Sequence, residues 1–178
     1  MEEHRGSEVE DIHEALIKRG LKKANVSFEE IGQMLDNSYL TKDMDWASIK
    51  TLGKAVKVYN AKKDTIIFTE GDMDAFLCLI VKGKVNIVKR DINNQEKVIA
   101  SINHGRTFGE MSVIDGEPRS ATAVAAMDTL LIMLSREDFL ILSEETPRLA
   151  VILVMNVAKL MSQKLRMASG ILVDHINK

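Results

Sequence analysis

Residues 56 to 134 form a succession of short β-type runs, each four to seven residues long and followed by turn residues. The runs are VKVY, TIIFT, FLCLIVK, KVNIVKR, KVIASI, SATAVAA and TLLIML, and the breaks include EGD at 70–72, Gly83 and Asn93-Asn94. Many short strands at near-regular spacing favour an antiparallel barrel or sandwich over a parallel sheet, which needs helical crossovers. The pattern predicts an antiparallel β jelly-roll barrel.

The segment before the strands has the signals of short helices. Two capping boxes mark helix starts, Ser7 with Glu10 and Ser27 with Glu30, and Gly20 is expected to end the first helix. A third helix is expected over about 44–53. The apolar residues expected to face the core from these helices are Val9, Ile12, Leu16, Ile17, Trp46, Ile49 and Leu52.

The segment after the strands predicts helix again. Ser135 is a candidate cap for a first helix, and Thr146 with Pro147 opens a long second one. At seam spacing this long helix carries Ala150, Leu153, Val157, Leu160, Lys164, Met167 and Ile171. Lys164 interrupts the seam, either by extending its amine to solvent or because something polar lies beneath it. The seam is longer than a barrel would cover, so we expect a homodimer through this helix.

These patterns predict an α+β fold in which N-terminal helices and a long C-terminal helix flank the barrel. Three segments are expected: an N-terminal helical extension over 1–42, the main domain with its C-terminal helix over 43–172, and a tail over 173–178.

Composition narrows the class of protein. The 24 basic and 26 acidic residues nearly cancel, so no global field favours nucleic acid or an anionic membrane. The single cysteine, Cys78, lies in an apolar run and is expected to be a buried, inert thiol. The lack of a disulfide framework favours the cytoplasm, and neither a signal peptide nor a membrane-spanning apolar segment is expected.

One stretch, FGEMSVIDGEPRSATA at 108–123, has the chemistry of an anion site. Gly109 would allow a ligand to approach the backbone, EMSVID is long enough for one helical turn with outward N–H groups, and Arg119 could clamp a phosphate. Ser120 adds a hydroxyl donor. Glu110 would repel phosphate, so it suits a ligand that also carries a hydroxyl group, such as a ribose. On chemistry alone, Glu110 and Arg119 could instead pair with each other across a turn.

From about residue 44 to 172 the chain resembles the cyclic nucleotide-binding domain family, which includes the bacterial catabolite activator protein and the regulatory subunits of cAMP-dependent protein kinase. The resemblance rests on EGD at 70–72, LIVKGKVNIV at 79–88 and the full stretch at 108–123, which we call the cassette. It implies a domain that senses a cyclic nucleotide.

The resemblance also implies roles for single residues. Glu110 would accept the ribose 2′-hydroxyl, Arg119 would hold the phosphate in a pocket, and Lys164 on the C-terminal helix would cover the base. The backbone of Gly109, Met111 and Ser112 would contact the phosphate, Ser120 would donate to phosphate or base, and Ile87 and Ile99 would pack against the base. Phe108 and Ala121 complete the expected ligand-binding set.

The ligand implied is cAMP, with cGMP left open because a hydroxyl residue follows Arg119. No metal, catalytic residue or enzymatic activity is expected, since the four histidines do not cluster and no nucleophile elbow occurs. DNA binding is not expected either, because the N-terminal helices are acidic. The partner implied is an unidentified regulated protein. A structural dimerisation module with a vestigial pocket remains the alternative.

Overall fold

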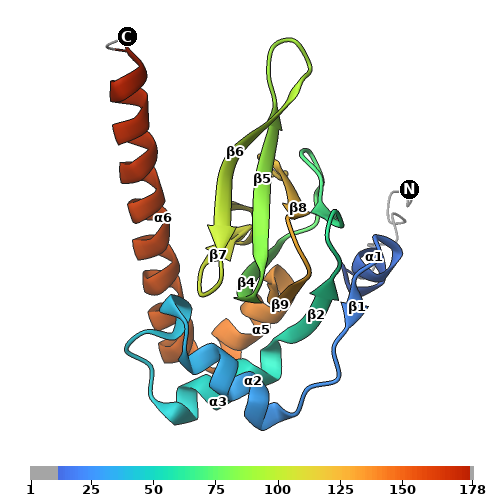
Figure 1. Ribbon diagram of the computed structural model, residues 1–178. Coiled ribbons are helices and arrows are strands. Elements are labelled where there is room, and N and C mark those ends of the chain that lie inside the picture. The colour runs from blue at the N-terminus through green and yellow to red at the C-terminus, as the bar shows by residue number, and fades with distance from the viewer. Residues whose placement is uncertain (1–11, 177–178) are drawn as a thin grey trace, which may run out of the picture.

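The computed structural model describes the backbone of residues 12–176 and the side chains up to residue 170. Five helical elements flank the strands on the N-terminal and C-terminal sides: α1 (Ile12–Lys18), α2 (Phe28–Asp36), the 3₁₀ turn η1 (Tyr39–Thr41), α3 (Trp46–Ala55) and, after the strands, α5 (Arg136–Glu145). The long helix α6 (Pro147–Ile176) follows, and it continues past residue 172 (Figure 1). The expected capping box that starts at Ser7 lies outside the described residues.

The strands form two antiparallel sheets. The first has the order β1 (Lys22–Lys23), β2 (Lys57–Ala61), β9 (Thr129–Ser135), β4 (Phe76–Lys82), β7 (Thr107–Phe108). The second has the order β3 (Ile66–Phe68), β8 (Thr122–Ala125), β5 (Lys84–Arg90), β6 (Glu96–Asn103). The short helix α4 (Glu110–Asp115) lies between β7 and β8 in the chain.

The jelly-roll-like α+β fold is confirmed, and the sheets do not close into a single barrel. All seven expected strands are present; the two-residue strands β1 and β7 were not foreseen.

Strand β4 divides the interior into two cores. Phe76, Cys78 and Ile80 point into a first core between the two sheets, whereas Leu77 and Leu79 point into a second core. This second core lies between the first sheet and helices α2, α3, α5 and α6. A strand with both faces covered reads as an unbroken apolar run, which explains FLCLIV. Burial also raises the pKa of the Cys78 thiol to about 12, as expected of an inert thiol.

The helix signals were mostly confirmed. Ser27 and Glu30 form the full capping box of α2, and Ser135 accepts a hydrogen bond from the Asp138 backbone N–H at the start of α5. Thr146 departs from expectation, because its hydroxyl donates to the Leu142 carbonyl at 3.0 Å and so closes α5. Its carbonyl, however, accepts from the Ala150 N–H at 3.1 Å, so Thr146 stands at the expected N-cap position of α6, with Pro147 as the first helical residue.

Two apolar residues predicted to be buried are exposed. Ile17 is 56% exposed, because the seven-residue α1 packs through Leu16 and position 17 lies on the next face. Trp46 is 39% exposed; the outer edge of its ring contacts α2, where a Cβ on Gly32 would come within 2.9 Å of it. The ring therefore contacts one helix while part of it remains in solvent.

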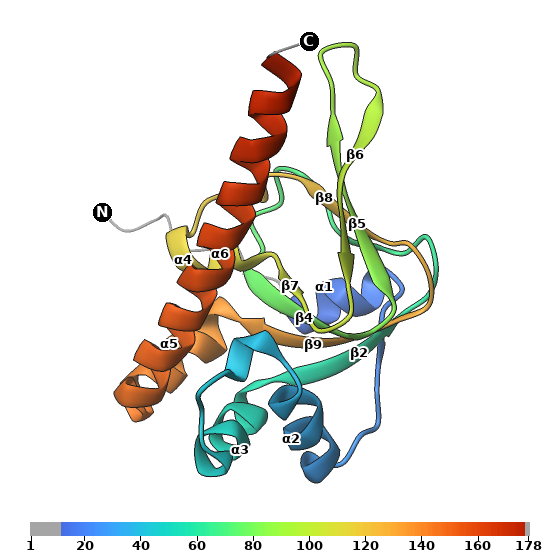
Figure 2. The same ribbon diagram turned by 60° about the vertical axis from the view of Figure 1, so that its left-hand side comes forward.

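Helix α6 lies along one side of the molecule. Its C-terminal end and the tip of the β5–β6 hairpin lie at the same end of the molecule (Figures 1 and 2). Its first half is anchored: Ala150, Leu153, Val157 and Leu160 are each at most 6% exposed. Met167 is 60% exposed, and the Ile171 side chain lies outside the described residues. Within the described residues, no helix has a stretch both long enough and apolar enough to traverse a lipid bilayer.

Candidate functional site

The cassette folds around a single short helix bounded by two glycines. Gly109 has φ +77° and precedes α4, and Gly116 has φ +75° and follows it. The N–H of Gly116 donates to the Ser112 carbonyl at 3.1 Å, which closes the helix. The helical turn predicted for EMSVID is therefore present, and the first-turn N–H groups of such a helix have no intrahelical acceptor.

Arg119 is turned inward and is only 3% exposed. Its guanidinium lies against two phenyl rings that meet edge to face, 4.0 Å from the centroid of Phe68 and 4.2 Å from that of Phe76. Its Nη1 donates to the Gly109 carbonyl and its Nη2 to the Phe76 carbonyl, both at 2.9 Å. The expectation that this side chain faces an open pocket is wrong in this conformation, because stacking and two backbone acceptors hold it inside.

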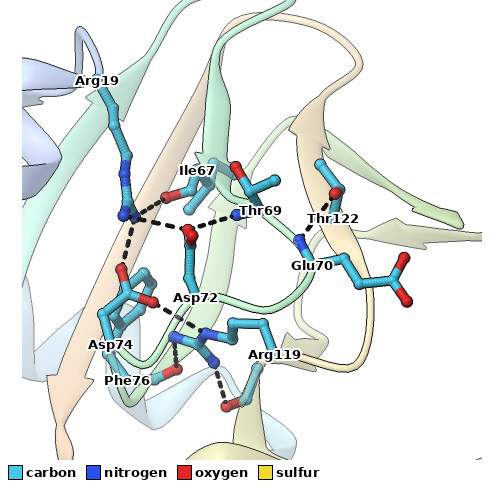
Figure 3. A network of polar contacts seen from close by, with 10 residues as sticks. Arg19, Ile67, Thr69, Glu70, Asp72, Asp74, Phe76, Arg119 and Thr122 are labelled. Atoms are coloured by element: carbon cyan, nitrogen blue, oxygen red, sulfur yellow. Dashed lines mark hydrogen bonds and ion pairs between the residues drawn. The ribbon is translucent and has the colours of Figure 1, made fainter.

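Burial lowers the pKa of Arg119, while the nearby carboxylate of Asp74 acts in the opposite direction. That carboxylate contacts Arg119 Nε at 3.4 Å, a long separation for an ion pair (Figure 3). The guanidinium remains charged at neutral pH, because arginine titrates far above it. A buried cation is thus held mainly by neutral carbonyls and aromatic faces, with one distant carboxylate.

The structure shows a packing reason for a glycine at position 109. A Cβ added there would lie 2.8 Å from the Phe76 carbonyl oxygen and 2.9 Å from Arg119 Nη1. The space that the missing Cβ leaves is therefore filled by the arginine and a backbone oxygen of the same chain. A glycine at this position therefore leaves room for the Arg119 side chain, and its role toward a ligand stays a prediction.

Glu110 is buried beneath helix α6, where it pairs with Lys164. Lys164 Nζ donates to Glu110 Oε1 at 2.5 Å and to the Thr107 carbonyl at 2.8 Å. The polar break in the apolar seam of α6 therefore does cover polar groups. Across the described residues, Glu110 Oε2 is the buried side-chain polar atom that lacks a hydrogen-bond partner. Glu110 and Arg119 do not pair with each other, since each has other partners.

The remaining predicted site residues are distributed around this pair. Met111 is 47% exposed, and its Sδ lies 3.8 Å from the hydroxyl of exposed Ser120, so α4 and the segment after Arg119 are in contact. Ser112 and Ala121 are buried. Phe108 is buried in the first core, where its ring centroid lies 5.9 Å from that of Phe68. It therefore packs against one of the two rings that contact Arg119.

The two predicted base-packing residues differ in their surroundings. Ile87 on β5 is partly buried and packs against the first core. Ile99 on β6 is 58% exposed and lies where the pairing register shifts, since Ile87 pairs with Ala100 and Val88 with Val98. Ile99 is therefore the extra residue of a β-bulge.

Sequence reasoning missed the residues that hold Arg119 in place: Phe68, Phe76 and Asp74. Asp74 follows the EGD turn closely, but it is 45 residues from Arg119 in sequence. No local pattern links positions so far apart, so only the packing of the sheets reveals the contact. The described part of the chain holds no group of three or more residues suited to a metal ion.

Comparison with known proteins agrees with this fold. The sequence model of the cyclic nucleotide-binding domain family matches residues 59–146. The cyclic AMP receptor protein of Thermus thermophilus is 41% identical over 102 residues, which are 57% of this chain and 45% of that protein. The cAMP-dependent protein kinase regulatory subunit of Candida albicans is 34% identical over 111 residues, 62% of this chain and 23% of that protein.

The chain thus spans less than half the length of either relative. A solved cyclic nucleotide-binding domain from Methylobacillus flagellatus is similar over nearly its whole length, with 30% identity and a TM-score of 0.78. That alignment covers 87% of this chain and 89% of the solved domain. Together with the intact cassette, these similarities show that the chain belongs to the cyclic nucleotide-binding domain family.

Proposed function

We propose that this chain is a regulatory module that senses cAMP and transmits its binding to a protein partner through helix α6. The observation that carries the proposal is Glu110, a buried carboxylate with one oxygen paired to Lys164 and the other without a partner among the described residues. Buried polar atoms are seldom left unsatisfied in native proteins. A ribose 2′-hydroxyl is a donor suited to that free oxygen.

The phosphate is assigned to Arg119 and to the N–H groups at the start of α4. The long 3.4 Å contact to Asp74 is the weakest of the polar contacts of Arg119, so a phosphate that approaches the guanidinium would displace this contact first. Phosphate oxygens accept two parallel hydrogen bonds from a guanidinium, which a single distant carboxylate oxygen does not match.

Helix α6 acts as the lid in this proposal. Lys164 already ties the helix to the cassette through Glu110 and the Thr107 carbonyl. A ligand that bonds Glu110 would change what holds Lys164 and therefore the position of the free half of α6. The resulting shift is what a second subunit or another protein would detect.

We favour cAMP over cGMP as the ligand. The names of both similar proteins refer to cAMP, and Ser120, the residue that left cGMP open, has its hydroxyl directed to Met111. Lys164 is a donor only, so it could serve the adenine N7 but not the adenine amino group. The amino group would need an acceptor from the backbone, from water or from a second subunit.

Isothermal titration calorimetry with cAMP, cGMP and 2′-deoxy-cAMP tests the function. A hydrogen bond to a charged group contributes roughly 1.5–3 kcal/mol, and each 1.4 kcal/mol changes affinity about tenfold. The parent should therefore bind 2′-deoxy-cAMP at least about tenfold more weakly than cAMP. Glu110→Gln should reduce that gap, because it weakens cAMP and leaves the deoxy ligand nearly unchanged.

Arg119→Met, which preserves packing against the two phenyl rings, should weaken all three ligands. Equal affinity of the parent for cAMP and 2′-deoxy-cAMP would contradict the role of Glu110, and a preference for cGMP would overturn the choice of base. If neither cAMP nor cGMP binds, the structural dimerisation module becomes the better interpretation.

A further inference from the structure

Asp74 lies between two arginines that come from distant parts of the chain. Its Oδ2 accepts from Nη1 of Arg19, directly after α1, at 2.6 Å, and its Oδ1 contacts Nε of Arg119 in the cassette at 3.4 Å (Figure 3). Arg19 also donates to the Ile67 carbonyl at 3.0 Å and pairs with Asp72 at 3.2 Å. One carboxylate therefore links the N-terminal helix to the cassette.

The carboxylate is shared unequally. Its contact with Arg19 is the shorter by 0.8 Å, the difference between 3.4 and 2.6 Å, so Asp74 compensates Arg19 more than Arg119. The side chains of Asp74 and Arg119 are 12% and 2% exposed, so solvent screens their interaction only weakly. The positive charge of Arg19 also lies close enough to help lower the pKa of Arg119. Arg19 therefore keeps the cassette arginine incompletely neutralised.

We propose that Arg19 is a positioning residue for the anion site: by holding Asp74, it leaves the charge of Arg119 available to a ligand phosphate and couples phosphate binding to the docking of α1. This inference rests on the proposed function for the identity of the anion. The inference goes beyond the proposed function because it makes the N-terminal helix α1 a second element, in addition to α6, that responds to the ligand.

The coupling follows from reciprocity. If Arg19 favours phosphate binding by withdrawing Asp74 from Arg119, then a phosphate on Arg119 releases Asp74 to Arg19 and tightens the docking of α1. The helix is short: of its seven residues Leu16 is buried in the first core, Ile12 packs against that core, and His13 Nδ1 lies 2.7 Å from the Tyr59 hydroxyl. A change in one ion pair can therefore shift its docking equilibrium measurably.

Calorimetry on Arg19 variants tests the effect on the site. Arg19→Gln should weaken cAMP and cGMP by the same factor, about fivefold or more, because the effect acts on the phosphate that both ligands carry. Arg19→Lys should restore part of the affinity, since its ammonium can pair with Asp74 but lacks the fork by which Nη1 binds Asp74 and the Ile67 carbonyl while Nη2 pairs with Asp72. Lys23→Ala removes an exposed positive charge from the next element and should leave both affinities unchanged. Unchanged binding by Arg19→Gln, or an equal loss in Lys23→Ala, would overturn the proposal.

Hydrogen exchange without any nucleotide tests the shared carboxylate separately. The amides of residues 16–19 should exchange more slowly in Arg119→Met, which leaves Asp74 to Arg19, and faster in Asp74→Asn. The amides of β9, in the centre of the first sheet, report any global change and serve as the reference. Unchanged or faster exchange of α1 in Arg119→Met, relative to β9, would overturn the coupling. If the parent binds neither nucleotide, the proposed function fails, while exchange still decides whether the two arginines compete for Asp74.

Discussion

At the scale of single residues, the two glycines that bound α4 share a backbone conformation but differ in their surroundings. Gly109 and Gly116 have φ of +77° and +75°, which L-residues with a Cβ rarely adopt. Around Gly109 a Cβ would meet backbone and Arg119 within 3 Å, whereas around Gly116 the nearest atom is the end of the flexible Arg136 side chain at 3.6 Å. The cassette is therefore crowded at one end and open at the other.

This difference gives a matched pair of substitutions. Gly116→Ala should lower the free energy of unfolding by about 1–2 kcal/mol through backbone strain alone. Gly109→Ala should cost about 1–3 kcal/mol more, because overpacking is added to the same strain. Urea unfolding of both variants gives the comparison. Equal losses would show that Arg119 and the Phe76 carbonyl do not crowd Gly109 in solution.

At the scale of elements, helix α6 is fixed to the N-terminal helices by a buried amide. The Nδ2 of Asn156, which is 3% exposed, donates to the Leu40 carbonyl at 3.0 Å and to the Lys42 carbonyl at 2.8 Å. These carbonyls lie in and just after η1. The contact holds the first half of α6 in place while the second half, with Lys164, extends over the cassette.

Asn156→Ala should therefore destabilise the protein by about 1–3 kcal/mol, the usual cost of leaving a buried polar group unsatisfied. Asn37 is a suitable control because its Nδ2 also donates to a backbone carbonyl, that of Gln33 at 2.9 Å, but in an exposed position. Asn37→Ala should change stability by less than about 0.5 kcal/mol. Thermal unfolding measures both variants. Equal decreases in their unfolding temperatures would contradict a stabilising role for the buried amide of Asn156.

At the scale of the whole molecule, helix α6 has two apolar faces: a seam that its own domain covers and a second set of apolar side chains that is exposed. Val157 and Leu160, which the sequence indicated as dimer contacts, are 5% and 6% exposed because their own domain covers them. The exposed apolar side chains Val151, Met155 and Leu165 are 63%, 54% and 69% exposed. At 100° per residue these three lie within about 40° of one line along the helix. If α6 carries a homodimer, this stripe is the surface that a second copy would cover.

Light scattering tests the dimer. The parent is expected to be dimeric at tens of micromolar, and Val151→Glu with Met155→Glu should give a folded monomer, because like charges would face each other across the interface. Lys159→Glu, at an exposed position off the stripe, should remain dimeric. Substitution of Val157 or Leu160 would be uninformative because it would damage the second core. A monomeric parent would contradict the homodimer.

The sequence by itself determined the features that depend on neighbouring residues. The limits of β4 and β5, the capping box of α2 and the helical turn of the cassette follow from a short apolar run, alternation, side-chain caps and glycine positions, which act over a few residues. The order of residues in the cassette was also sufficient to indicate the family. These signals are local, so the linear chain contains them in full.

Only the tertiary structure decided where the charged side chains go. Arg119 turns inward because Phe68 and Phe76 come from other strands to enclose it, and Asp74 holds it from a different turn. Arg19 reaches Asp74 across 55 residues of sequence. Likewise, the sequence shows that the α6 seam is apolar but not what covers it. Such contacts depend on how sheets and helices pack, because only packing brings distant charges and apolar faces within reach.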